Sequence, residues 1–406
     1  MKAISFEAPT SKYVATRLAG RISDSLLVGP HACTRYKNVS PPELPSAGWV
    51  RIQTRLGGIC GSDLGIIALR ASPAASPFSS FPFVLGHESV GTIESVGQAI
   101  RGFSVGDRVT VNPLLSCEPR ALAPLCPACV AGNQSRCTRF SNDDNVAPGM
   151  FIGTTRGLGG SWGEYFVAHQ SQLVRVPDEM SDAGAVLIEP FACCVHAVRG
   201  TMPEPKQRIL VIGAGTMGLL TVAALRALAP DPEITLLVRH LFQAQYAKDL
   251  GANKSVLARG NYLATLADVA GTTLLTPIMG RPIGVGGFDM VYVCTDSRRG
   301  LEDAMRFTRA GGTIVLLGNT STLPGLDWTP LWLKELTIRG TLAYGEHSHG
   351  GATMNAFTEA AAMIADGRAP VSSLVTHEYA LDDYPEALQT ARSKGLGESV
   401  KVAFRF

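Results

Sequence analysis

Two groups of residues in this sequence combine side-chain types that bind zinc. The first begins with Cys60, in a glycine-rich segment, and continues with the adjacent pair His87 and Glu88. Thiolate, imidazole and carboxylate are all good ligands for a divalent zinc ion. Glu189 interrupts an apolar run, where burying an acid is costly unless it is paired or bound to a metal. The sequence therefore predicts a metal site with Glu189 as a third or outer ligand, although each residue alone also fits a structural role.

The second group is a cluster of four cysteines. Cys126 and Cys129 have the two-residue spacing that wraps one metal ion, and Cys137 follows closely. Four thiolates would close a tetrahedral structural zinc site with no position open to a substrate. Cys117 is the weakest member, because residues 118–125 separate it from Cys126. The alternative is a surface loop of free thiols.

A third segment has the pattern of a dinucleotide site. The apolar run Ile209–Ile212 has the length and β-branched content of a buried parallel strand. It stops at Gly213, after which Gly215 and Gly218 lead into the helical run Leu219–Leu228. Such glycines allow a tight turn, close approach of the backbone to a pyrophosphate and close packing of helix on strand. The pyrophosphate would bind the free N–H groups that start the helix; a plain turn between strand and helix is the alternative.

The residues after the second strand of this region indicate which nicotinamide cofactor is bound. NAD-binding folds usually place Asp or Glu there to accept hydrogen bonds from the ribose 2′-OH. This chain has Arg239 and His240, and no acid before Asp249. Because an arginine attracts a 2′-phosphate, NADP is favoured over NAD, unless Arg239 points to solvent. The residues predicted to contact the cofactor are Gly213, Gly215, Thr216, Met217, Gly218, Arg239, His240, Cys294 and Leu317.

Strand and helix patterns alternate through residues 208–345. Such alternation predicts an α/β fold, a doubly wound parallel sheet of the Rossmann type, with ligands at the carboxyl ends of its strands. Residues 1–56 are expected to form short strands with long connections, at the start of a β-rich domain. The tail closes with an apparent strand, Val400–Phe404, that could return to the sheet of this first domain. The predicted domains are 1–192 with 346–406, carrying the zinc sites, and 193–345, binding the dinucleotide.

Composition fits a well-buried enzyme and excludes several partners. The 406 residues are too many for one ordinary core and suggest two or three domains. A formal net charge of +2 gives no support for nucleic acid or an acidic membrane as a partner. No apolar run approaches the ~18 residues that span a bilayer, and the N-terminus lacks the apolar core of a signal peptide. We therefore expect a cytoplasmic protein with mostly reduced cysteines, among which the solitary Cys33 packs in a core.

In combination these residues resemble the zinc-containing medium-chain dehydrogenase/reductases, among them alcohol, polyol, threonine and glucose dehydrogenases. Residues 58–63, around Cys60, are similar to the catalytic-zinc loop of that family, and Gly86-His87-Glu88 is similar to its zinc-binding Gly-His-Glu. Three of the clustered cysteines, all but Cys117, match its structural-zinc lobe, and the glycine pattern matches its cofactor fingerprint. Glu189 followed by proline is similar to the polyol-dehydrogenase branch.

The resemblance implies a GroES-like β-rich domain and a Rossmann domain, with hydride transfer between an alcohol carbon and the nicotinamide assisted by zinc. Ser62 would start the proton relay, but Gly65 stands where many relatives carry a relay histidine. Glu88 and Glu189 are alternating candidates for the acidic ligand. Relatives form dimers or tetramers, so a homodimer or homotetramer is expected. The catalytic residues implied are Cys60, Ser62, His87, Glu88 and Glu189.

The leading hypothesis is a zinc-dependent dehydrogenase that transfers hydride between NADP(H) and a small-molecule secondary alcohol or polyol, or the corresponding carbonyl. One alternative is a zinc-free quinone or enoyl reductase on the same fold. A second alternative is a catalytically silent NADP-binding protein that acts as a redox sensor or structural partner. Zinc analysis separates the first two readings, because only the leading hypothesis requires the metal.

Overall fold

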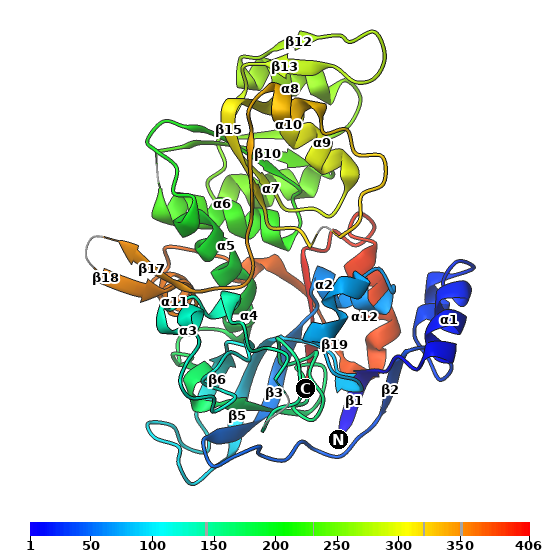
Figure 1. The fold of residues 1–406 in the computed structure, drawn as a ribbon, viewed down its shortest axis with the longest axis vertical. Helices are drawn as coiled ribbons and strands as arrows, with labels where there is room; N and C mark the ends of the chain where they lie inside the picture. The colour runs from blue at the N-terminus through cyan, green and yellow to red at the C-terminus, as the bar shows by residue number, and fades with distance from the viewer. Residues whose placement is uncertain (143–144, 230, 320, 350–351) are drawn as a thin grey trace. The chain divides into compact units, whose positions relative to one another are not determined.

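The computed structural model describes residues 1–406 except 143–144, 230, 320 and 350–351. The chain forms two compact units (Figure 1). Unit 1 comprises Met1–Glu189, Tyr344–Ala365 and Val375–Phe406, and unit 2 comprises Pro190–Ala343 and Asp366–Leu374. The domain boundaries expected from the sequence, after residues 192 and 345, stay a prediction, because a compact unit need not fold independently.

Unit 2 is built around a sheet of six parallel strands in the order β11-β10-β9-β14-β15-β16. The chain begins in the middle of the sheet, runs outward to one edge and then returns to the strand on the other side of the first. This is the strand order of a doubly wound fold, so the predicted Rossmann sheet is confirmed. The strands are β9 (Arg208–Ile212), β10 (Glu233–Val238), β11 (Lys254–Leu257), β14 (Phe288–Val293), β15 (Thr308–Leu316) and β16 (Thr337–Gly340).

The apolar runs of these strands are continuous because both faces of the sheet are buried. In β9, Leu210 and Ile212 share an apolar cluster with Leu266 and Leu301, which lie on helices. Side chains alternate along a strand, so the equally buried intervening residues of β9 face the opposite side. The helices and the hairpin of this unit are α6 (Thr216–Leu228), α7 (Leu241–Asp249), α8 (Tyr262–Ala270), β12 (Thr273–Leu275), β13 (Ile283–Val285), α9 (Arg298–Phe307) and α10 (Thr329–Leu333); α5 (Ile188–Gly200) begins in unit 1.

Unit 1 contains a larger, mostly antiparallel sheet, and its long central strand β3 (Trp49–Gly58) positions the site described below. At its carboxyl end Gly58 pairs with Glu88 on one side and with Ala403 on the other. The tail therefore returns to this sheet, as the sequence predicted. The other strands of the sheet are β5 (Glu88–Val96), β6 (Arg108–Val111), β7 (Tyr165–His169), β8 (Leu173–Arg175), β19 (Val375–Ala380) and β20 (Lys401–Arg405).

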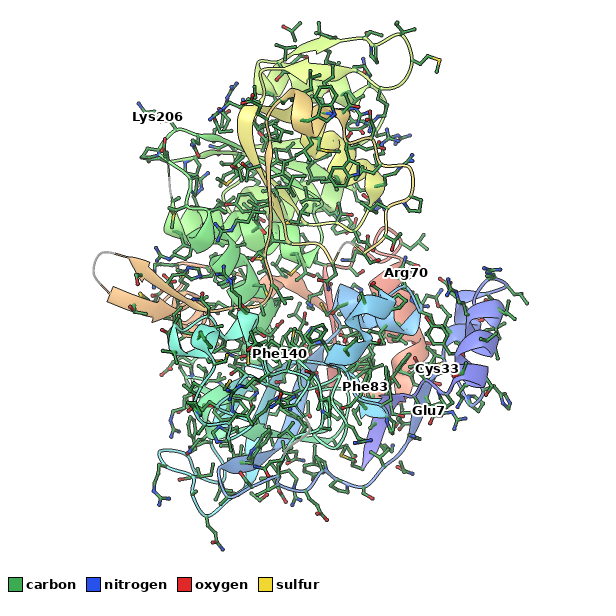
Figure 2. The ribbon with its side chains drawn as sticks, in the orientation of Figure 1. Glu7, Cys33, Arg70, Phe83, Phe140 and Lys206 are labelled. Atoms are coloured by element: carbon green, nitrogen blue, oxygen red, sulfur yellow. The ribbon has the colours of Figure 1, made fainter. Side chains whose placement is uncertain are left out.

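The N-terminal segment differs from the expectation of strands and connections alone. A small sheet of β1 (Lys2–Phe6), β2 (Thr34–Asn38) and β4 (Phe83–Val84) is present, but α1 (Thr10–Ala19) is a helix. The sequence gives no apolar periodicity for this helix because Thr16 is its one buried residue. Cys33 is fully buried in the apolar cluster that includes Phe83, which confirms its packing role (Figure 2).

The remaining α-helices and strands of unit 1 are short or lie in the tail. They are α2 (Gly61–Ile67), α3 (Pro127–Val130), α4 (Asp182–Val186), β17 (Glu346–His349), β18 (Ala352–Asn355), α11 (Ala356–Ala365) and α12 (Tyr384–Arg392). Within the described part of the chain, no helix has both the length and the apolar character that crossing a membrane requires.

Candidate metal and cofactor sites

Three residues predicted to bind zinc come together at the end of β3. Cys60 precedes α2, and His87 directly precedes β5, whose first residue is Glu88. One ligand atom from each of the three lies within 4.8 Å of the others. Sulfur, nitrogen and oxygen donors at this separation fit a zinc ion. We call these three residues together with Glu189 the mixed-ligand site.

Asp63 orients two of these residues and was not predicted from the sequence. Its buried carboxylate accepts a hydrogen bond from Cys60 N at 3.0 Å through Oδ2, and Oδ1 lies 3.3 Å from His87 Nδ1. Burial lowers the pKa of His87, but the Asp63 carboxylate and, to a smaller extent, Cys60 outweigh it and raise that pKa well above its usual value. With Nδ1 turned to Asp63, Nε2 is left for a metal. An acid three residues after Cys60, the spacing of a capping box, was the available signal.

Glu88 is fully buried and bound to a lysine from the far end of the chain. Lys401 Nζ donates to its two carboxylate oxygens at 2.6 and 2.5 Å and to Ile59 O at 3.2 Å. Burial lowers the pKa of Lys401, but the Glu88 carboxylate raises it above its usual value. Both oxygens of this predicted zinc ligand are therefore already engaged. Lys401 was missed, although it was the one charged residue of the predicted strand Val400–Phe404.

Glu189 lies outside the closest group of ligand atoms but is electrostatically coupled to it. Its Oε1 accepts a hydrogen bond from Tyr344 at 2.8 Å. Burial raises the pKa of Glu189 to about 7, with the His87 charge opposing and the Glu88 charge adding to this shift. An acid that gains and loses its proton near neutral pH can accept either a proton or a metal ion. Tyr344 gave no signal in the sequence.

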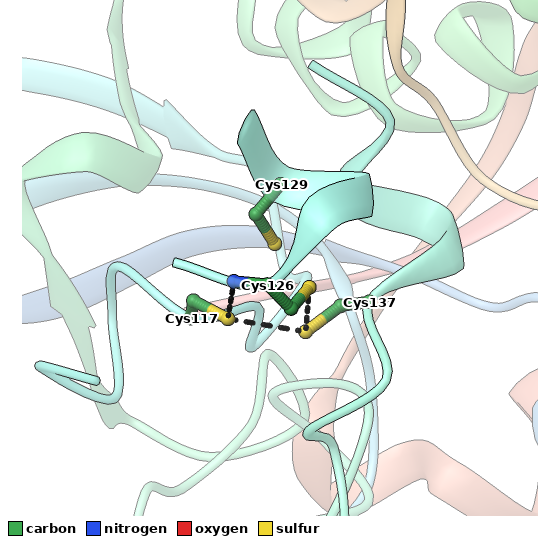
Figure 3. A group of neighbouring side chains, drawn as sticks. All are labelled: Cys117, Cys126, Cys129 and Cys137. Atoms are coloured by element: carbon green, nitrogen blue, oxygen red, sulfur yellow. Dashed lines mark hydrogen bonds between the residues drawn. The ribbon is translucent and has the colours of Figure 1, made fainter. Parts of the chain in front are cut away.

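The four predicted cysteines form the second group, here called the four-cysteine cluster (Figure 3). Cys117 Sγ lies 3.6 Å from Cys137 Sγ, which lies 3.9 Å from Cys126 Sγ. Tetrahedral zinc with bonds of about 2.3 Å places its sulfurs about 3.8 Å apart, so the arrangement fits the metal. All four thiols are free rather than in disulfides. Cys117, the weakest member in the sequence, lies in the cluster with the other three.

Backbone amides prepare one thiol of this cluster to lose its proton. Burial alone would raise the pKa of Cys126, but hydrogen bonds from the backbone of Thr138 and Cys129 lower it to about 6. Burial raises the pKa of Cys129 to about 11 and that of Cys137 further. Because thiolate is the zinc-binding form, the cluster begins with one ligand already deprotonated at neutral pH.

The glycine pattern in unit 2 forms a cradle at the end of β9. Gly213 has φ +99°, a conformation that other residues rarely adopt. A Cβ on Gly218 would lie 1.7 Å from Gly213 O, so only glycine fits where the helix crosses the turn. Gly215 caps α6, which starts at Thr216 rather than at Leu219 as predicted. The free N–H groups of this first turn fit a pyrophosphate.

The other predicted cofactor residues lie along the same edge of the sheet. Met217 is in the first turn of α6. Cys294 follows β14 and donates its N–H to Ile212 O at 2.9 Å, and Leu317 follows β15. Arg239 and His240 follow β10 directly. Burial raises the pKa of Cys294 to about 12, so this thiol stays protonated at neutral pH.

Two segments of the chain match families of known proteins. Residues 46–178 match the family described as alcohol dehydrogenase GroES-like domain, and residues 216–365 match the family described as zinc-binding dehydrogenase. Together the matched segments cover more than half of the chain. The chain belongs to the zinc-containing medium-chain dehydrogenase/reductase family. The predicted family and the predicted GroES-like and Rossmann architecture are thus confirmed.

Similar proteins in this family are dehydrogenases. L-idonate 5-dehydrogenase of Vitis vinifera is 28% identical over 373 residues, which are 90% of this chain and 91% of the relative. Sorbitol dehydrogenase of Arabidopsis thaliana is 28% identical over 371 residues, with the same coverage of both chains. A solved zinc-binding dehydrogenase of Sinorhizobium meliloti bound to NADP is 25% identical with a TM-score of 0.70, covering 92% of this chain and 96% of the other.

Proposed function

We propose that this dehydrogenase/reductase requires zinc and transfers hydride between NADP(H) and a secondary alcohol or polyol, or the corresponding carbonyl. The observation that carries the proposal is that Cys60 and His87 bring a sulfur and a nitrogen ligand atom within 4.8 Å of each other, with the buried acid Glu189 electrostatically coupled to His87. Three protein ligands with one open position are the pattern of a catalytic zinc site. The four-cysteine cluster, which has no such opening, would hold a structural zinc.

Each residue of the mixed-ligand site has a separate role in this proposal. When bound, zinc would supply a Lewis acid for the substrate oxygen and the nicotinamide would supply the hydride acceptor or donor. Cys60 and His87 would hold the metal, and Asp63, whose Oδ1 lies 3.3 Å from His87 Nδ1, would leave Nε2 of the imidazole for it. Because Lys401 engages both oxygens of Glu88, we assign Glu189 as the acidic ligand.

The proton of the substrate hydroxyl needs a path away from the metal. Ser62 is half-buried at the second position of α2, two residues after Cys60, and its hydroxyl forms no hydrogen bond with the described residues. Its hydroxyl is therefore free to accept that proton and to donate its own to solvent. Gly65 has no side chain that continues such a relay, so water must take the next step.

The substrate class and the cofactor rest on different observations. The names of the relatives, L-idonate 5-dehydrogenase and sorbitol dehydrogenase, support a polyol-like substrate. The place of Arg239 after β10 supports NADP over NAD, as does the NADP in the related solved structure. We further propose a homodimer or homotetramer, which light scattering measures. The cytoplasmic location stays a prediction.

The test is zinc content measured on protein purified without chelator, together with NADPH and NADH titrations and a panel of polyols. We expect about two zinc ions per chain, one for each group of ligands, and oxidation of at least one polyol with NADP. A folded protein that binds NADPH but contains no zinc would contradict the proposal and favour the zinc-free reductase. One zinc that persists in Cys60→Ser would mean that the mixed-ligand site holds no metal.

A further inference from the structure

The carboxyl edge of the unit 2 sheet carries a second arginine that the sequence analysis did not single out. β10 and β11 are parallel neighbours in which Val238 pairs with Leu257, and Ala258 N donates to Val238 O at 2.7 Å. Arg239 is the first residue after β10, and Arg259 is the second after β11. Neighbouring strands lie only about 4.8 Å apart, less than the reach of one arginine side chain. Both guanidinium groups can therefore reach one ligand at this edge.

The charged residues at the two ends of these strands differ, because, among the described residues, those at the amino ends are paired and those at the carboxyl ends are not. At the amino ends, Lys254 Nζ and Glu233 Oε1 form an ion pair at 2.7 Å. At the carboxyl ends, Arg239 and Arg259 are both exposed, and neither forms an ion pair with any residue that the structure describes. Positive charge therefore stays uncompensated at the edge where a doubly wound sheet binds its ligand.

The turn that carries Arg239 is held without a negative charge. The buried Gln243 accepts hydrogen bonds through Oε1 from the backbone N–H groups of Arg239 and His240, each at 3.1 Å. This is the capping box that starts α7, a position where glutamate serves equally well as acceptor. With glutamine rather than glutamate at this position, the side chain that holds the turn brings no negative charge next to Arg239 to repel an anion.

The order of the strands shows which part of a dinucleotide would meet them. The cradle that fits a pyrophosphate follows β9, and β10 and then β11 lie beyond it on one side. In a doubly wound fold the adenosine ribose lies at the end of the second strand. We propose that Arg259 is a second specificity-determining residue, which binds the 2′-phosphate of NADP(H) together with Arg239. This inference rests on the NADP preference proposed above.

The experiment measures binding of two cofactor fragments by calorimetry on the full-length protein. Adenosine 2′,5′-bisphosphate carries the 2′-phosphate, whereas 5′-AMP lacks it. Arg259→Ala should weaken the bisphosphate by about 10- to 100-fold and change 5′-AMP by no more than about twofold, because one charge-assisted interaction is lost. Arg259→Lys should keep part of the preference, since it keeps the charge without the planar fork. Lys254→Ala, which removes the same charge from the other end of β11, is the matched control and should leave the preference unchanged.

The outcomes separate the inference from the proposed function. If wild type prefers the bisphosphate, and Arg239→Ala abolishes that preference while Arg259→Ala keeps it, the role of Arg259 is wrong and the NADP proposal stands. An equal loss in Lys254→Ala would reveal a general charge effect and also overturn the role of Arg259. If wild type shows no preference, the NADP proposal and the inference fail together. Unchanged melting temperatures would establish that each variant is folded.

Discussion

The two candidate zinc groups of unit 1 differ in what surrounds their ligands. The four-cysteine cluster consists of sulfur alone, and all its ligands come from residues 117–137. The mixed-ligand site contains one sulfur, and its acids are held by Lys401 and Tyr344 from the tail. Four thiolates satisfy tetrahedral zinc completely, which suits a metal that only stabilises the fold. In the mixed-ligand site, the buried acids already have partners in the protein, Lys401 for Glu88 and Tyr344 for Glu189. Such acids can exchange a protein partner for the metal, which suits a catalytic zinc that must keep one coordination position open.

Cys60→Ser should give the largest effect, because it should disable the mixed-ligand site and leave the four-cysteine cluster intact. Loss of this thiolate should remove the zinc of the mixed-ligand site and lower kcat on the order of a thousandfold, the size of a lost Lewis acid. NADPH affinity and melting temperature should change little, because the cofactor residues and the four-cysteine cluster are intact. Zinc analysis, steady-state kinetics and fluorescence titration measure these quantities. Equal loss of NADPH binding would contradict the role assigned to Cys60.

Lys401→Met should test whether the ion pair between Lys401 and Glu88 stabilises the mixed-ligand site. The substitution leaves the Glu88 carboxylate buried without a partner, which costs about 3–5 kcal/mol of unfolding free energy. Denaturant titration of this variant, of Glu88→Gln and of the double variant measures the coupling between the two residues. Additive effects of the two substitutions would mean that the pair does not interact as the 2.5 Å contact indicates.

Cys129→Ser should show the opposite pattern to Cys60→Ser. Opening the four-cysteine cluster should cost about 3 kcal/mol and lower the melting temperature by roughly 6–12 °C, with kcat per folded molecule nearly unchanged. Differential scanning calorimetry and kinetics at a low temperature measure both quantities. Cys33→Ser provides a control, because it removes a buried thiol that belongs to neither group of candidate metal ligands among the described residues. Unchanged melting of Cys129→Ser would exclude a structural zinc.

Glu189 should give the smallest step of the four, because its effect on stability is spread over several pH units. In zinc-free protein its folded-state pKa of about 7 exceeds the usual 4.5, so between these pH values the folded state keeps a proton that the unfolded state has lost. Its contribution to stability is therefore complete below pH 4.5 and disappears as pH rises through 7, by about 1.4 kcal/mol per pH unit. Glu189→Gln should remove this slope. Identical slopes in denaturant titrations of both proteins would show that Glu189 is not the titrating group.

The regular parts of the fold were predictable because their causes are local. The buried parallel strand before Gly213 and the strand Glu233–Val238 follow from short apolar runs, and the glycine turn follows from a conformation that other residues rarely adopt. The helix α1 was missed for the converse reason. It buries so little of its surface that no periodic pattern marks it in the sequence.

The sequence by itself determined the ligand types and the closely spaced groups: the cysteines of residues 117–137, the pair His87 and Glu88, and the glycine turn. Tertiary structure alone decided which distant groups hold the acids. Lys401 lies 313 residues from Glu88, and Tyr344 lies 155 residues from Glu189. Arg239 and Arg259 follow neighbouring strand ends only because β10 and β11 pair in parallel register. The spacing of residues along the chain predicts which side chains are neighbours within one turn or one strand. Which charges from distant parts of the chain come together depends on how the strands pair, and the sequence spacing does not show this.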